Sequence, residues 1–274
     1  MYKRKPIIIG NWKMHTLLSD AMILTEAIQH GLESVRGLDV VLCPPFVWLY
    51  AVKEALLRGG PIHLSLGAQN VFTEEEGAYT GEVSVKMLKG LVSYVIVGHS
   101  ERRYKIGRGE DDATINKKIR LILAHGLHPI VCVGERVKQF KRGRGRPRLE
   151  HGKDIVEQLK EDFVGVAPHD VLRTVIAYEP VWAIWSEGKG DPATGGYANE
   201  QIARLRAALG EWYGGEIADG TRILYGGSSN SENAPEFLRQ PEVDGLLPGH
   251  ASLKASEFIL MCKEAASIKQ TDVK

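Results

Sequence analysis

The sequence predicts an α/β protein of one domain, a closed barrel of eight parallel strands with helices outside. Short, almost continuously apolar runs recur along the 274 residues, and amphipathic segments separate them. Runs without polar alternation are typical of parallel strands that are buried on both faces. Eight such runs without a linker between halves favour the closed barrel, which usually takes about 250 residues. A doubly wound open sheet is the alternative fold.

The predicted strands follow one another along the whole chain, and the eighth has the weakest pattern. They are expected at Ile7–Ile9, Val40–Leu42, His63–Ala68, Tyr94–Val97, Ile130–Val133, Thr174–Ala177, Arg222–Leu224 and Gly245–Leu247. No Gly-x-Gly-x-x-Gly motif follows the first of them, which argues against a dinucleotide-binding version of the open sheet.

The segments between the strands have the periodicity of helices. Asp20–Gly31 carries apolar residues close to a 3.6-residue period, and Ser19 or Asp20 is expected to cap it. Asp112–His125 has one apolar face and is expected to end at Gly126, as helices often do at a glycine. Similar patterns predict two more helices, Gly152–Phe163 and Asn199–Trp212.

The composition is that of an ordinary globular protein, with 43% hydrophobic and 25% charged residues. Lys and Arg total 35 against 34 Asp and Glu, and a net charge of +1 gives no general attraction to nucleic acid or to an anionic membrane. No run approaches the roughly 20 apolar residues of a membrane span or the core of a signal peptide. Cys43, Cys132 and Cys262 are widely spaced, which suggests no disulfide framework or zinc site and fits a reducing cytoplasm.

One segment, 138–148, departs from this composition because it is basic and rich in glycine. It is expected to be a surface loop inserted into the single domain of residues 1–274. Its Arg144–Pro147 run is similar to the core of a minor-groove AT-hook, so a non-catalytic barrel that binds nucleic acid through 142–148 is one hypothesis. The other interpretation is a solvated loop without a nucleic-acid partner.

Polar residues follow several of the predicted strands, at the end where α/β barrels carry their chemistry. Asn11 and Lys13 follow the first, His99 to Glu101 the fourth, and Glu179 the sixth. Glycine-rich turns follow the seventh and eighth strands, and such turns expose N–H groups that hold phosphate.

These residue types point to one kind of chemistry. A carboxylate beside an imidazole suits proton abstraction next to a carbonyl, and a lysine stabilises the negative charge that develops. No set of His, Asp or Cys has the spacing of a metal site, which favours catalysis without a metal. From the residues alone, the sequence therefore predicts the enolisation of a phosphosugar in a barrel.

The same residues lie in six ordered segments, which resemble the signature segments of the triosephosphate isomerase family. The segments are Gly10–Met14, Gly77–Glu82, Val97–Arg103, Cys132–Glu135, Tyr178–Ile184 and Tyr225–Ser228. The resemblance extends from about residue 6 to 260. It implies a cytoplasmic homodimer that interconverts dihydroxyacetone phosphate and glyceraldehyde 3-phosphate through an enediolate, with no metal or cofactor.

The resemblance also implies which residues react. Glu179 would be the base that moves the proton, and His99 a neutral imidazole that polarises the carbonyl. Lys13 would supply positive charge, oriented by Asn11 and Glu101. For Glu101, as for Arg102, a purely structural ion pair is an equal alternative.

Further residues are implied to bind phosphate, to form a lid or to contact a second subunit. The N–H groups of Ser228, Gly249 and His250 would hold the phosphate. The lid would run from Pro180 to about Thr194, and a long loop from Gln69 to Gly81 would interlock a dimer. The remaining implied positions are Val181, Trp182 and Gly188 in the lid, Ile184 and Leu247 packed beside Glu179, Tyr225 and Ser228 as the latch, and Thr80 against the Asn11 region of the partner subunit.

Two departures from the family pattern bear on the substrate. Trp185 stands where the lid has a phosphate-contacting glycine, and the pair Gly195–Gly196 is expected to loosen the far hinge. His250 replaces a glycine whose N–H points at phosphate. They motivate a second hypothesis, a related aldose–ketose isomerase for a four-carbon phosphosugar.

Overall fold

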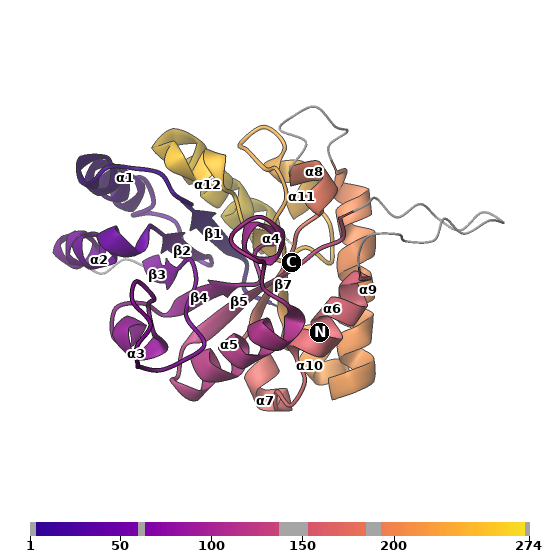
Figure 1. Ribbon diagram of the computed structural model, residues 1–274. Helices are drawn as coiled ribbons and strands as arrows, with labels where there is room; N and C mark the ends of the chain where they lie inside the picture. Colours follow the sequence, from indigo (N-terminus) through magenta and orange to yellow (C-terminus); the bar gives the residue numbers. More distant parts are fainter. Residues whose placement is uncertain (1–3, 60–63, 137–152, 185–192, 272–274) are drawn as a thin grey trace.

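The computed structural model describes residues 4–59, 64–136, 153–184 and 193–271, and its eight strands close into one parallel barrel (Figure 1). Each strand pairs with the next in sequence, and β1 closes the ring against β8, where Ile7 is paired with Gly245. The predicted closed barrel is confirmed, and the open-sheet alternative is wrong. The strands are β1 (Ile7–Asn11), β2 (Asp39–Cys43), β3 (Leu64–Ala68), β4 (Tyr94–Val97), β5 (His128–Val133), β6 (Val175–Tyr178), β7 (Arg222–Tyr225) and β8 (Gly245–Leu246).

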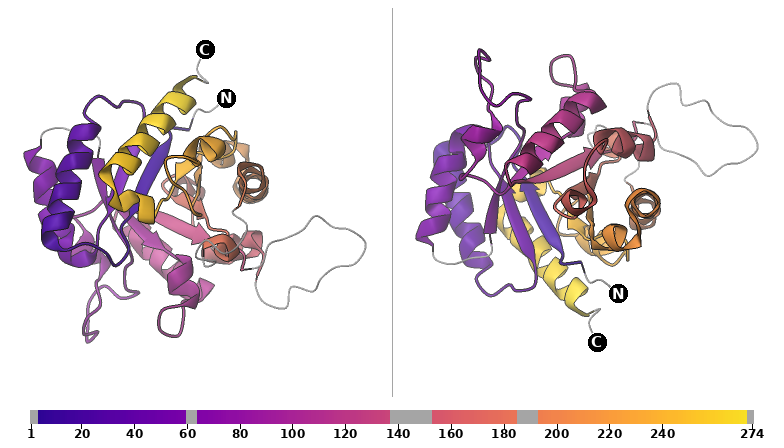
Figure 2. Two further views of the ribbon diagram at one scale, coloured as in Figure 1. Left: turned by 90° about the horizontal axis from the view of Figure 1, so that it is seen from above. Right: turned by 90° about the horizontal axis from the view of Figure 1, so that it is seen from below.

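The helices surround this barrel, and the C-terminal helix α12 lies beside β1 (Figures 1 and 2). The helical elements include two short 3-10 helices, η1 and η2. In chain order they are α1 (Leu18–Gly31), η1 (Phe46–Trp48), α2 (Leu49–Arg58), α3 (Val85–Leu88), α4 (Ser100–Tyr104), α5 (Asp112–Ala124), α6 (Ile155–Asp162), α7 (Pro168–Val171), α8 (Val181–Ile184), α9 (Gly195–Tyr213), α10 (Gly215–Gly220), α11 (Ala234–Leu238), η2 (His250–Leu253) and α12 (Ala255–Thr271). In the described ranges, none is long and apolar enough to cross a membrane.

The strands are apolar on both faces because each face packs against a different core. Ile7 and Ile9 of β1 belong to a cluster inside the barrel, which also contains Cys132 of β5. Ile8 points the other way, into the larger cluster between the strands and the helices. Successive strand residues alternate between two dry environments, which is why the sequence shows continuous rather than alternating apolarity.

Two predicted helix starts differ from the structure. The first helix begins at Leu18, so neither Ser19 nor Asp20 is its N-cap; Asp20 lies in the first turn and accepts a hydrogen bond from the Leu17 N–H at 3.2 Å. The pair Gly195–Gly196 forms the first turn of α9, capped by the Thr194 hydroxyl, and is therefore not a loose hinge.

The predicted stop of the helix at Gly126 is confirmed, because that glycine adopts a left-handed conformation with φ of 80° just after α5. The expected insertion at 138–148, the start of the strand at His63 and the start of the helix at Gly152 lie outside the described residues.

Candidate active site

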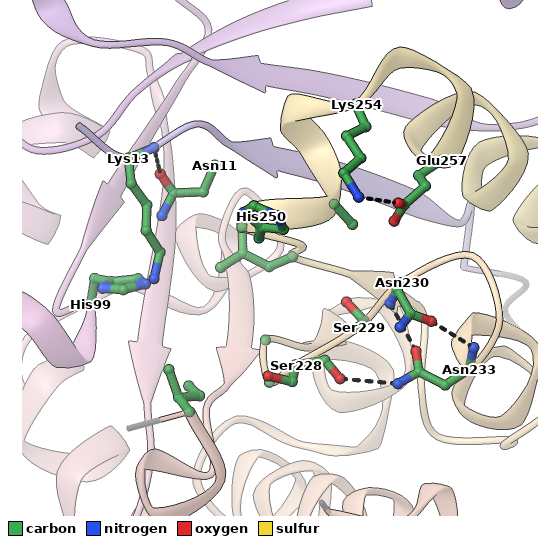
Figure 3. Close-up of a pocket in the computed structure, with 16 residues that line it drawn as sticks. Asn11, Lys13, His99, Ser228, Ser229, Asn230, Asn233, His250, Lys254 and Glu257 are labelled. Carbon is green, nitrogen blue, oxygen red and sulfur yellow. Dashed lines mark hydrogen bonds and ion pairs between the residues drawn. The ribbon is translucent and has the colours of Figure 1, made fainter. Parts of the chain in front are cut away.

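The carboxyl ends of the strands surround a cavity of about 450 Å³ (Figure 3). Residues from β1 and from the segments after β1, β4, β7 and β8 meet around it, as the positions of polar residues in the sequence predict. The lining residues are Asn11, Lys13, His99, Ile184, Gly226, Gly227, Ser228, Ser229, Asn230, Asn233, Leu247, Gly249, His250, Ala251, Lys254 and Glu257.

Lys13 is held in an unusual backbone conformation after β1. Its φ of 51° is left-handed, which costs a residue with a side chain about 1–2 kcal/mol. The Asn11 Oδ1 accepts from the Lys13 N–H at 3.0 Å, and the Gln69 amide donates to the Lys13 carbonyl at 2.8 Å. The ammonium contacts Glu101 Oε1 at 2.8 Å, and Figure 3 shows the Lys13 side chain extending from the end of β1. These contacts fix one positive charge at the wall of the cavity.

His99 follows β4 and caps the short helix α4. Its Nδ1 accepts from the Glu101 N–H at 3.3 Å, so the ring's proton belongs on Nε2, the nitrogen that is free to donate. The side chain is 7% exposed and lines the cavity. The Nε2 side of the ring is therefore available to donate a hydrogen bond toward whatever occupies the site.

Glu179 follows β6 and is 1% exposed, behind the wall of the cavity rather than in its lining. Its Oε2 accepts from the Ser100 N–H at 2.9 Å, while Oε1 lies 3.0 Å from His99 Nε2 and accepts no aligned hydrogen bond from a described residue. A Cβ on Gly134 would lie 1.7 Å from the Glu179 carbonyl oxygen. Only glycine therefore allows the residue after β5 to lie this close to the backbone of Glu179. One oxygen is thus tethered and the other faces the imidazole.

Glu135, just after β5, accepts hydrogen bonds from three side chains. It is not among the site residues predicted from the sequence, although it is the last residue of the motif segment Cys132–Glu135. It is 2% exposed, and burial raises the pKa of its carboxyl group. Its Oε1 accepts from Tyr178 Oη at 2.7 Å, Trp182 Nε1 at 2.8 Å and Tyr197 Oη at 3.0 Å. The carboxyl therefore ties the end of β6 to α8 and to the start of α9.

The described part of the implied lid begins beside Glu135. Pro180 and Val181 are buried, and the Val181 N–H donates to the Glu135 carbonyl at 3.1 Å. Ile184 and Leu247 lie in the cavity wall, and the Tyr225 ring stacks on Phe237 with centroids 3.9 Å apart.

Other implied residues lie elsewhere. Trp185 and Gly188 are outside the described residues, whereas Thr80 is exposed on the segment before α3 and does not line the cavity. Arg102 forms an ion pair with Glu110 at 2.6 Å and takes no part in the cavity.

The turn after β7 and the segment after β8 offer backbone donors. Within the described residues, the N–H groups of Ser228, Gly249 and His250 donate to no other protein group. Gly249 lies close to Lys13, since a Cβ there would be 3.1 Å from Lys13 Cε. In the same part of the chain, no three His, Cys, Asp or Glu side chains are arranged to hold a metal ion.

The cysteines are predicted to be unreactive in the native protein. Cys43, Cys132 and Cys262 are free and fully buried, and burial raises the pKa of each thiol. For Cys132, the neighbouring Glu179 carboxylate raises the pKa further. A disulfide reagent such as DTNB should label no thiol in the folded protein and three after denaturation. Rapid labelling of native protein would contradict the burial of these groups.

Comparison with known proteins identifies the family of this chain. The family model described as triosephosphate isomerase matches residues 6–265, which includes all eight strands. A relative of that name from Dehalococcoides mccartyi is 45% identical over 267 residues, covering 97% of this chain and 100% of the relative. Relatives from Roseiflexus sp. and Chloroflexus aurantiacus, which carry the same name, are also 45% identical; the matches cover 93% of this chain and 96% and 97% of the relatives.

Proposed function

This chain belongs to the triosephosphate isomerase family and has triosephosphate isomerase activity, and we propose that Glu179, His99 and Lys13 carry the reaction. Glu179 acts as the base, His99 as the neutral donor to the substrate carbonyl, and Lys13 as the fixed positive charge. The contact of His99 with Glu179 on one side and the Lys13–Glu101 pair on the other is the observation that carries the proposal.

The proposed reaction is a proton transfer between adjacent carbons. The Glu179 carboxylate leaves the Ser100 N–H and takes a proton from the carbon next to the carbonyl, and the electron pair passes to the carbonyl oxygen. The His99 Nε2–H donates to that oxygen, and the Lys13 ammonium stabilises its negative charge. A proton then passes from the neighbouring hydroxyl group to the former carbonyl oxygen. As Glu179 returns its proton to the carbon that bore the carbonyl, the electron pair on the deprotonated hydroxyl oxygen forms the new carbonyl, which completes the exchange between ketose and aldose.

The phosphate group of the substrate is assigned to the other side of the cavity. The N–H groups of Ser228, Gly249 and His250 lack protein acceptors in the described ranges, and all three residues line the cavity, Gly249 next to Lys13. Ile184 and Leu247 supply apolar parts of the cavity wall, which favours exclusion of water during proton transfer.

A coupled assay tests these assignments. Purified protein is given glyceraldehyde 3-phosphate, and dihydroxyacetone phosphate is read as NADH loss through a glycerol-phosphate dehydrogenase. Fast turnover that is lost on substitution of Glu179 supports the proposal. A higher kcat/KM for a four-carbon ketose phosphate would instead favour the alternative substrate.

The nucleic-acid hypothesis rests on 142–148, outside the described residues, and fails if DNA retention is absent or independent of salt.

We also propose a homodimer, formed through the connections after the adjacent strands β1, β2 and β3. These connections expose large apolar side chains: Met14 is 94% exposed, Val47 72% and Tyr79 46%. We take the exposed apolar side chains of these three connections together as the proposed apolar patch for a partner, and Thr80 lies next to Tyr79 on the third connection. The proposed location is the cytoplasm, consistent with three free cysteines.

A charge placed in this patch should dissociate the dimer. Met14→Arg or Thr80→Arg is expected to reduce the molar mass, measured by light scattering at low micromolar concentration, from twice the chain mass to one. An unpaired charge in a buried interface costs several kcal/mol, which is why one substitution suffices. Val164→Arg is the matched control, because Val164 is 61% exposed after α6, away from these connections. A parent protein that is monomeric would overturn the proposal.

A further inference from the structure

His250 puts a titratable side chain into the wall of the cavity that the assigned reaction does not use. It is the first residue of η2, exposed, and it lines the cavity. Figure 3 shows it between the Lys13–His99 group and the Lys254–Glu257 pair. Among the described residues, no hydrogen bond or ion pair involves its imidazole ring.

Among the described residues, the other charged side chains that line the cavity are paired with opposite charges. Lys13 is paired with Glu101 at 2.8 Å, and Lys254 of α12 with Glu257 at 2.9 Å. The turn after β7 contributes only glycine, serine and asparagine to the lining.

The imidazole of His99 is already engaged on both ring nitrogens. Its Nδ1 accepts from the Glu101 N–H, and its Nε2 faces the Glu179 carboxylate at 3.0 Å. Glu179 adds one negative charge behind this wall, and within the described residues the protonation of His250 therefore raises the charge around the cavity by one unit.

We propose that His250 is an anion-binding group whose imidazolium strengthens the binding of the substrate's phosphate as the solution becomes more acidic. This inference rests on the proposed placement of the phosphate at Ser228, Gly249 and His250. An imidazole changes charge in the physiological range, and a unit charge at the rim of a partly solvated site changes the affinity for a dianion roughly five- to tenfold. By linkage, a bound dianion must in turn draw a proton onto the site.

Inorganic sulfate is the suitable probe, because it stays a dianion from about pH 6 to 8.5, whereas a phosphate group titrates near 6. Sulfate is measured as a competitive inhibitor of triose phosphate turnover. The inhibition constant of the parent protein is expected to rise roughly five- to tenfold from about pH 6 to 8.5. In His250→Gln, which keeps the backbone N–H and a polar side chain, the inhibition constant should change little with pH.

Two further variants separate this effect from general changes. His169→Gln removes an exposed histidine from α7, at the amino end of the barrel, and should keep the full pH dependence. Glu257→Gln leaves Lys254 without its carboxylate and should tighten sulfate binding at every pH without changing the slope. Calorimetry in two buffers of different ionisation enthalpy should detect proton uptake on sulfate binding by the parent and not by His250→Gln.

The possible failures are distinguishable. An undiminished pH dependence in His250→Gln overturns the role of His250 while leaving the phosphate site intact. Sulfate that does not compete with substrate overturns the placement of the phosphate itself, and with it this part of the proposed function.

Discussion

Replacing Glu179 by Gln is expected to lower kcat for glyceraldehyde 3-phosphate by about 10³- to 10⁴-fold, the contribution of a well-placed general base. The amide has nearly the same size as the carboxylate, and its carbonyl oxygen still accepts from the Ser100 N–H, which lies 2.9 Å from Oε2 in the parent. The substitution therefore removes the proton acceptor and little else. The NADH-coupled assay measures the loss directly.

The division between kcat and KM identifies the cause of this loss. The proposed phosphate contacts come from β7 and β8 rather than from Glu179, so KM should change much less than kcat. Glu179→Asp keeps a carboxylate one methylene shorter, and it should retain more turnover than Glu179→Gln. Circular dichroism confirms that each variant is folded. Turnover of Glu179→Gln within about tenfold of the parent would remove Glu179 as the base.

The sequence predicts the barrel well because the strand signal is local. A strand such as β5 is buried on both faces, so its residues are apolar without interruption, and the predicted Ile130–Val133 differs from the observed His128–Val133 only at its start. Helix starts are less predictable because several polar residues compete to cap them. Asp20 is a good cap by type, yet the chain turns into helix two residues before it, at Leu18.

The site residues divide in a similar way. Asn11, Lys13 and His99 are found from their positions after strands, and the cavity contains all three. The contact of Glu179 with the Ser100 N–H joins residues 79 positions apart, so no local pattern shows it.

Arg103 is a second residue whose role depends on distant partners. Its guanidinium contacts Asp162 at 2.5 Å, and it also donates to the Gly98 carbonyl at 2.8 Å and the Cys132 carbonyl at 3.0 Å. It therefore connects the chain at the ends of β4 and β5, a function that its place in a motif does not reveal.

Replacing Arg103 by Met is expected to reduce the free energy of unfolding by about 3–5 kcal/mol, because it leaves buried charge without its partner. Arg103 is 6% exposed and also contacts Asp112 at 2.5 Å, while Asp162 is fully buried. Urea unfolding at one fixed protein concentration measures the change. Arg173→Met is the matched control: its ion pair with Asp170 is partly exposed, so the loss should stay below about 1 kcal/mol.

The Arg103 variant should also have a characteristic pH dependence. Burial raises the pKa of Asp162 to about 7, and Arg103 opposes that rise. An acid with a raised pKa in the folded state favours folding at low pH, and this contribution is lost as pH rises through the folded pKa. Without Arg103 the pKa of Asp162 rises further, so above about pH 7 the parent tolerates the ionised carboxylate and the variant does not.

The destabilisation by Arg103→Met should therefore be larger at about pH 8.5 than at about pH 6, where Asp162 is mainly protonated in both proteins. The double variant Arg103→Met, Asp162→Asn has no carboxyl to ionise at this position, so this part of the pH dependence should disappear from it. If the single variant loses the same unfolding free energy at both pH values, ionisation of Asp162 does not cause the loss. The stabilising role of Arg103 would then lie in its contacts with Asp112 and with the carbonyl groups of Gly98 and Cys132.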